Sequence, residues 1–128
     1  MRTTILLAAS LFLFGIANAT PCHLAVDQLH DAMAICQHEI KDATSGQYSN
    51  YRSVTVRSIL DTIAGHALAA GRYEPALRPS LDQFLEEVAQ ERTDTFRYQY
   101  YRLSTVVMTM GAYKIYLGKV VSQIQCGE

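Results

Sequence analysis

The chain has 128 residues, 49% of them hydrophobic, and its 11 basic and 12 acidic side chains leave a net charge of −1 at pH 7. Near neutrality argues against functions that depend on a large charge excess, so we expect neither a nucleic-acid partner nor attraction to an acidic membrane surface. The length suits one small domain with one hydrophobic core.

Residues 1–19 have the features of a secretory signal peptide. Arg2 provides a basic start, an apolar run covers residues 5–16, and Ala17-Asn18-Ala19 has the small-x-small pattern of a cleavage site. The apolar run is short for a bilayer span, which disfavours the alternative of a retained membrane anchor. We therefore predict that residues 20–128 form a single helical domain with no membrane span, exported to the periplasm or secreted.

The first helix is predicted over about residues 24–43. Apolar residues recur at alternating steps of four and three, which is the pattern of a helix packed in a bundle. This predicted seam consists of Cys22, Val26, Leu29, Met33, Cys36, Ile40 and Ala43.

The polar face of the first predicted helix carries a candidate metal site. His23, Asp27 and His30 are spaced at i, i+4 and i+7 and therefore share one face. Two imidazoles and a carboxylate suit copper, nickel or zinc. The competing interpretation is an ordinary solvated face, which we favour, so the metal site stands as the alternative and no cofactor is expected.

The second and third helices are delimited by capping residues. The second is predicted to start near Ser49 or Asn50 and to stop at Gly71. Residues 72–79, which include two prolines, form a connection. The third helix opens at Ser80, which forms a capping-box pattern with Gln83, and ends near Thr93.

The fourth helix is predicted over residues 96–125. Its apolar positions recur at helical spacing, interrupted at Lys114, and a second apolar stripe runs beside the first. The predicted seam is Phe96, Tyr100, Leu103, Val107, Met110, Leu117, Val121 and Ile124. We favour a break at Thr93-Asp94-Thr95 over one continuous helix through residues 81–125, because these three residues prefer helix ends. No strand and no internal repeat are expected.

These elements predict an all-α fold, a four-helix bundle of the up-down type with a short third helix. Cys22 precedes the first helix and Cys126 follows the last, so an even number of antiparallel helices brings both to one end of the bundle. We therefore predict a Cys22–Cys126 disulfide. A Cys22–Cys36 bond is disfavoured, because fourteen helical residues span about 21 Å. Cys36 is left either buried and free or paired with a second subunit.

A cluster of tyrosine and arginine near residue 100 is the candidate partner-binding site. These residue types are enriched at interface hot spots. The predicted binding residues are Arg97, Tyr98, Tyr101, Arg102, Tyr113 and Tyr116. No catalytic motif is found, so we expect a non-enzymatic protein that binds another protein, such as an inhibitor or immunity-type protein. A homodimer is the alternative partnership.

Overall fold

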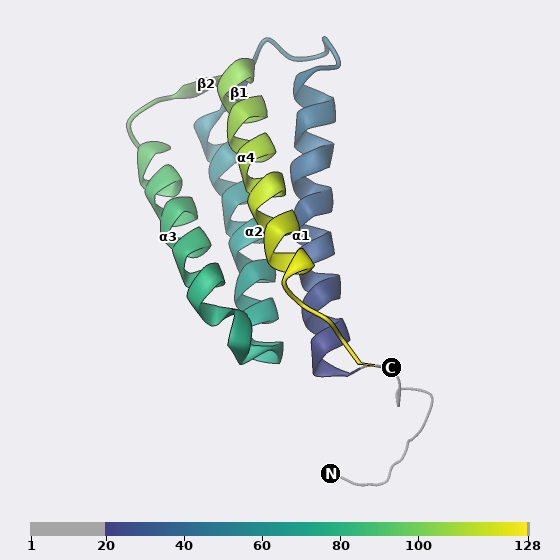
Figure 1. Cartoon of the computed structure of the whole chain (residues 1–128). Coiled ribbons are helices and arrows are strands. Elements are labelled where there is room, and N and C mark those ends of the chain that lie inside the picture. Colours follow the sequence, from purple (N-terminus) through teal and green to yellow (C-terminus); the bar gives the residue numbers. More distant parts are fainter. Residues whose placement is uncertain (1–19, 128) are drawn as a thin grey trace, which may run out of the picture.

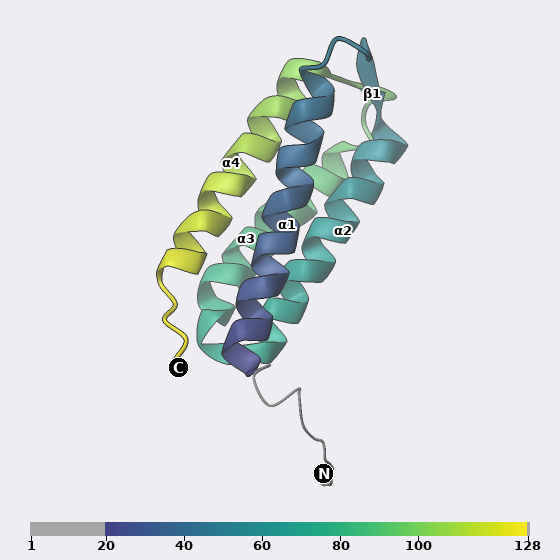
Figure 2. The ribbon, with the colours of Figure 1, turned by 90° about the vertical axis from the view of Figure 1, so that its right-hand side faces the viewer.

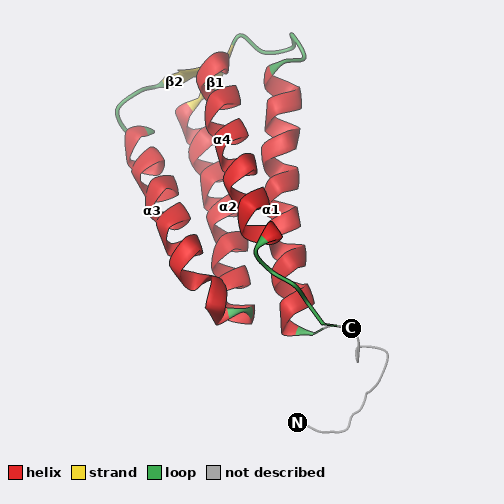
Figure 3. Cartoon of the chain, in the orientation of Figure 1, coloured by secondary structure: helices red, strands yellow, loops and turns green. Residues whose placement is uncertain are grey.

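The computed structural model describes residues 20–127, so the predicted signal peptide, residues 1–19, lies outside the described residues. Within that range the chain forms four α-helices that alternate in direction and pack side by side (Figures 1 and 3). They are α1 (Pro21–Ala43), α2 (Ser53–Tyr73), α3 (Arg78–Asp94) and α4 (Leu103–Ser122). The predicted all-α four-helix bundle is confirmed, and α3 is its shortest helix. None of the helices in the described range is long and apolar enough to cross a membrane.

Helix α1 packs along both α2 and α4, whereas α3 packs chiefly against α2 and contacts α4 less extensively (Figure 2). The fully buried positions of α1 and α2 include four alanines, which permit close approach of the helices. The largest fully buried side chains come from all four helices and include Leu29, Leu60, Phe84 and Met110. Each large aliphatic or aromatic side chain removed from water contributes roughly 1.5–3 kcal/mol to folding.

Two short strands, which the sequence patterns did not predict, join the helices at one end of the bundle. β1 (Asn50–Arg52) pairs antiparallel with β2 (Tyr100–Arg102), and Tyr51 lies opposite Tyr101. The predicted helical start at residue 96 is therefore wrong, because residues 100–102 form β2 and α4 begins only at Leu103. Likewise α2 begins at Ser53 rather than at residue 49 or 50. Tyrosine suits a pleated, half-buried surface, and strand pairing supplies the backbone hydrogen bonds that a helix would otherwise provide.

The break between α3 and α4 is confirmed, and the alternative of one helix over residues 81–125 is wrong. Thr95 is buried, and its hydroxyl donates to the Arg92 carbonyl at 2.6 Å. The side chain of Arg57 reaches across from α2, and its Nε donates to Thr95 Oγ1 at 3.0 Å. These contacts satisfy the end of α3 and fix the point at which the chain turns away. A 3₁₀ turn, Pro75–Leu77, leads into α3 at its other end.

The buried faces of α1 and α4 agree with the predicted seams only in part, at Leu29, Cys36 and Ala43 in α1 and at Met110 and Leu117 in α4, and the other buried positions lie one residue before a predicted seam position. In α1 the buried positions are Ala25, Leu29, Ala32, Cys36 and Ala43. In α4 they are Val106, Met110, Tyr113, Leu117 and Val120. In α1 the predicted seam favoured the larger Val26 and Met33, whereas the smaller Ala25 and Ala32 are the residues that are buried. The buried stripe of α4 avoids Lys114, whose Nζ donates to Gln37 Oε1 at 2.6 Å at the bundle surface.

The predicted disulfide joins the two ends of the described chain. Cys22 and Cys126 are bonded, with their Cα atoms 5.5 Å apart. Cys36 is free and buried in the core. Burial disfavours the thiolate and raises the pKa of Cys36 to about 12, so the thiol is unreactive at neutral pH.

Candidate functional site

The end of the bundle where β1 and β2 lie, opposite the chain ends in Figure 1, carries exposed aromatic and arginine side chains. We call this group the tyrosine–arginine end. Its members are Tyr48, Arg52, Phe96, Arg97, Tyr98, Tyr100 and Arg102. Its four rings are between 48% and 64% exposed. Rings this exposed bury apolar surface only when a partner covers them.

The strand pair positions the centre of this surface. Alternation along each three-residue strand turns Tyr51 and Tyr101 into the bundle and turns the flanking side chains out. Across the strands the outward residues are opposed in two pairs, Asn50 with Arg102 and Arg52 with Tyr100. The pairing register therefore brings together side chains from two segments far apart in the sequence.

Two arginine side chains pack against the ring of Phe96. The guanidinium carbon of Arg57 lies 3.8 Å from the centre of the Phe96 ring, and Arg92 approaches the same ring at 5.7 Å. Arg92 is in turn paired with Asp61, with Nε to Oδ1 at 2.6 Å. Stacking of arginine on an aromatic face is attractive and restricts the motion of both side chains. The exposed Phe96 ring is therefore held by the arginine side chains that pack against it.

Three of the six predicted binding residues, Arg97, Tyr98 and Arg102, lie on the tyrosine–arginine end. The other three support the fold. The hydroxyl of Tyr101 donates to Glu91 Oε2 at 3.2 Å. The hydroxyl of half-buried Tyr116 donates to the Ser80 carbonyl at 2.8 Å.

Tyr113 is buried, and its ring packs edge-on against Phe84 at 5.1 Å between centroids. Tyr101 differs from the expectation because residues 100–102 form a strand whose middle side chain faces the bundle. Tyr113 and Tyr116 lie on the side of α4 that packs against Phe84 of α3. The sequence analysis did not select Tyr48, Arg52, Phe96 or Tyr100 as binding residues, and it placed Phe96 and Tyr100 on the predicted seam of the fourth helix.

The candidate metal residues lie exposed on α1. Within residues 20–127 no group of three histidine, cysteine, aspartate or glutamate side chains is placed to hold a metal ion. His23 is engaged locally, with Nδ1 2.6 Å from Thr20 Oγ1 at the start of the helix. Nothing in the described part of the chain therefore favours the metal alternative.

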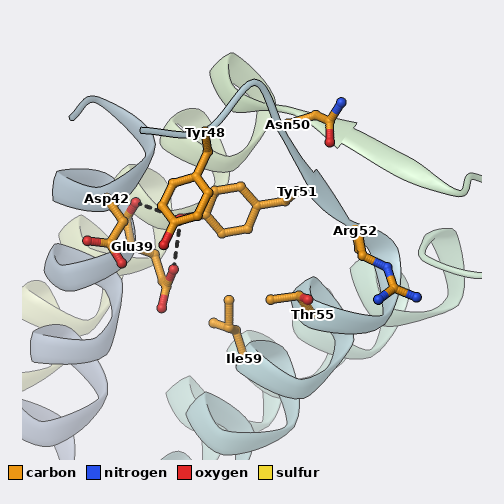
Figure 4. A pocket seen from close by; sticks show the side chains of 8 residues that line it. All are labelled: Glu39, Asp42, Tyr48, Asn50, Tyr51, Arg52, Thr55 and Ile59. Carbon is orange, nitrogen blue, oxygen red and sulfur yellow. Dashed lines mark hydrogen bonds between the residues drawn. The ribbon is translucent and has the colours of Figure 1, made fainter. Parts of the chain in front are cut away.

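A pocket of about 400 Å³ lies beside β1, between the end of α1 and the start of α2 (Figure 4). It is lined by Glu39, Asp42, Tyr48, Asn50, Tyr51, Arg52, Thr55 and Ile59. The Tyr51 hydroxyl donates to Glu39 Oε1 at 2.9 Å, and the Tyr48 ring lies tilted over that of Tyr51, with centroids 5.8 Å apart. Burial, together with the hydrogen bond to Glu39, raises the pKa of Tyr51.

The chain contains an internal repeat, which corrects the expectation that there is none. Five residues recur fifty positions later, as Tyr48, Tyr51, Arg52, Thr55 and Val56 in one half and Tyr98, Tyr101, Arg102, Thr105 and Val106 in the other. On the preceding helices, Glu39 and Asp42 recur fifty-two positions later as Glu91 and Asp94. The two halves are α1-β1-α2 and α3-β2-α4.

Burial follows the same correspondence. The five buried positions of α1 match Leu77, Leu81, Phe84, Val88 and Thr95, all buried, at the fifty-two-residue offset. At the fifty-residue offset Val56, Leu60, Ile63, Ala67 and Ala70 match the five buried residues of α4. The pairing of Tyr51 with Tyr101 places an approximate two-fold axis through the strand pair, and both tyrosines donate to the equivalent glutamate.

Comparison with protein-family models, with curated proteins and with solved structures finds no match to this chain.

Proposed function

We propose that this protein is exported and acts by binding another protein through the tyrosine–arginine end, as an inhibitor or immunity-type protein would. The observation that carries the proposal is the gathering of four exposed rings and three arginines at one end of the bundle. The Cys22–Cys126 disulfide supports the export part of the proposal, because such bonds persist in oxidising compartments.

The physical basis is the cost of ordering side chains on binding. Immobilising a flexible side chain costs about 0.5–1.5 kcal/mol, so a surface whose residues are already held binds more favourably. Phe96 packs against Arg57, and strand pairing fixes the backbone that carries the outward residues. Large rings and arginine then supply contact area and directional hydrogen bonds.

A second copy of the chain is the alternative partner. On the outer face of α4, Met108 is 74% exposed and Ile115 is 63% exposed, and the two are seven residues apart on the same helix face. Two such faces packed together would cover both residues in each copy. Light scattering on the purified protein decides between this arrangement and a different protein partner.

The test of the proposal is affinity capture from the exported fraction of the cells that make the protein. The wild type should retain a specific partner. A Tyr100→Ala, Arg102→Ala double variant should lower the affinity for that partner at least about tenfold, because it removes two centrally placed side chains of the types that dominate interfaces.

The matched control is Arg72→Ala with Tyr73→Ala. It removes the same two residue types, both exposed, from the C-terminal end of α2 at the other end of the bundle. Thermal unfolding of each variant checks that the fold is kept. Equal retention by both double variants, or no partner retained by the wild type, would contradict the proposal.

A further inference from the structure

We propose that the pocket beside β1 receives a cationic side chain, an arginine or lysine, of the partner protein. The cation would be held by the carboxylates of Glu39 and Asp42 and by the rings of Tyr48 and Tyr51. This inference rests on the proposed function and names the chemistry by which one part of the partner is recognised.

The internal repeat supplies the first argument. Six of the eight residues that line the pocket have an identical counterpart in the second half, and only Asn50 and Ile59 differ. Among the ten matched buried helix positions only two pairs are identical, Leu29 with Leu81 and Val56 with Val106. The two halves have therefore kept the pocket residues while their cores diverged.

The roles of some of these residues in the fold explain part of the sequence identity between the two halves. The hydrogen bond from Tyr51 to Glu39 connects β1 to α1, and the equivalent hydrogen bond from Tyr101 to Glu91 connects β2 to α3. Tyr48 also has a role in the fold, because its ring packs against that of buried Tyr51 as the ring of Tyr98 packs against that of buried Tyr101. Arg52 and Thr55 are exposed. Within residues 20–127 the side chains of Arg52 and Thr55 make none of the hydrogen bonds or ion pairs found, so their recurrence favours a surface that contacts something outside the chain.

The charges around the pocket define what fits. Glu39 is half-buried, and it belongs to none of the three ion pairs found among residues 20–127. Asp42 contacts His38, with Nε2 to Oδ2 at 3.1 Å. The one cationic residue in the lining, Arg52, lies on the other side of the pocket, and its guanidinium points away from both carboxylates (Figure 4).

Two carboxylates beside two tyrosine rings make a site for a cation. A guanidinium or ammonium group forms charge-assisted hydrogen bonds to carboxylates, and it is also attracted to the faces of aromatic rings. The volume of about 400 Å³ lies in the range of small-ligand sites, which is sufficient for one long side chain. An anionic or purely apolar group would leave Glu39 desolvated without compensation.

The second half shows how such a carboxylate is satisfied. Asp94, the counterpart of Asp42, has an arginine of its own chain nearby, with Arg97 Nη1 to Asp94 Oδ1 at 3.9 Å. The corresponding connection in the first half is two residues longer and turns through Gly46, at a positive φ of 84°, without any arginine. In the first half Asp42 contacts His38 instead, and no arginine of the connection pairs with it, so the carboxylates of Glu39 and Asp42 can still accept a cation from a partner.

The test uses short peptides and the full oxidised protein labelled with ¹⁵N. The probes are acetyl-Gly-Arg-Gly-amide, its lysine analogue and its citrulline analogue, which keeps the shape of arginine without the charge. We expect amide shifts confined to the pocket, with a dissociation constant in about the millimolar range for a single anchored side chain. Citrulline should bind about tenfold more weakly or not at all.

The variant that removes the site is Glu39→Gln with Asp42→Asn. Glutamine still accepts a hydrogen bond from Tyr51, so the strand should stay in place while both charges are lost. Peptide binding should fall at least about tenfold. The matched control is Glu91→Gln with Asp94→Asn in the second half, which should leave binding unchanged.

Three results would overturn the inference. They are equal shifts with arginine and citrulline peptides, shifts that lie away from the pocket, and binding of free putrescine without binding of either cationic peptide. A captured partner that tolerates Glu39→Gln with Asp42→Asn but is lost on Tyr100→Ala with Arg102→Ala would overturn the pocket inference alone and leave the proposed function standing.

Discussion

Two buried tyrosines hold the strand pair against the helices through the same contact made twice. Tyr51 donates to Glu39 and Tyr101 donates to Glu91, and both rings are 7% exposed. Burial disfavours the phenolate and raises the pKa of both hydroxyls, and the nearby carboxylates raise it further. Burial likewise raises the pKa of Tyr113.

These shifts predict a loss of stability at alkaline pH. The tyrosine pKa is about 10 in an unfolded chain and higher in the native state, so the native state favours the protonated form. Their contribution is complete below pH of about 10 and declines as pH rises toward the native pKa, by at most about 1.4 kcal/mol per pH unit for each tyrosine.

Urea unfolding over a series of alkaline buffers, with tyrosinate absorbance recorded in parallel, measures this effect. Three of the eight tyrosines should ionise only when the protein unfolds. Tyr51→Phe combined with Tyr101→Phe should make the decline less steep. Ionisation of all eight tyrosines while the protein remains folded would refute the prediction.

At the scale of elements, the strand pair acts as a clamp between the starts of α2 and α4. Strands of three residues are not stable alone, so neighbouring contacts must hold them. Ser53, at the start of α2, provides two such contacts. Its backbone N–H donates to the Gln99 carbonyl at 2.9 Å, and its hydroxyl donates to the Tyr98 carbonyl.

Ser53→Ala should therefore destabilise the protein by about 1–2 kcal/mol, because a buried hydrogen bond to the Tyr98 carbonyl is lost. Ser58→Ala on the same helix is the matched control. Ser58 is exposed, and a surface substitution of this kind changes stability by less than about 0.5 kcal/mol. Chemical denaturation of both variants measures the difference. Equal midpoints would show that the hydrogen bond from the Ser53 hydroxyl to the Tyr98 carbonyl does not stabilise the protein.

The four helices could be predicted from the sequence, whereas the two strands and much of the candidate site could not. The break near Thr95 could be predicted because Thr93-Asp94-Thr95 prefers helix ends through local side-chain contacts. The strand at residues 100–102 could not, because its stability depends on pairing with a segment fifty residues away. For the same reason Tyr101 could not be told apart from its exposed neighbours Tyr98 and Arg102, although it is buried.

At the scale of the whole molecule, the disulfide closes the chain into a ring. Cys22 and Cys126 are separated by 104 residues in sequence. A crosslink across a long loop restricts the unfolded chain and contributes typically 2–4 kcal/mol to stability.

Cys22→Ser with Cys126→Ser should therefore lower the free energy of unfolding by roughly that amount, measured by urea denaturation. Alkylation of the denatured, unreduced wild type, followed by intact-mass measurement, checks the thiols. One label, at Cys36, is expected, and three labels would show that the bond does not form. In the native protein Cys36 should resist labelling, because it is buried and its pKa is raised to about 12.

The approximate two-fold relation between the halves is also a property of the whole molecule. The repeat of Tyr48, Tyr51 and Arg52 at Tyr98, Tyr101 and Arg102 is visible in the sequence once the offset is known. It is weak as a sequence signal, because the helix cores have diverged and the two offsets differ by two residues. The matched burial of both halves makes the relation evident.

The sequence by itself determined the all-α class, the four helices and the Cys22–Cys126 disulfide. Helical periodicity and capping residues act within one segment, and counting the helices is enough to place both ends of the chain at the same end of the bundle. Only the tertiary structure decided which stripe of α4 is buried, because that helix has apolar side chains on more than one side and its neighbours select among them. The tertiary structure also decided that Tyr100 is exposed and Tyr101 is buried. A side chain in a strand faces the core or the solvent according to register, and here the register is set by pairing between the two halves.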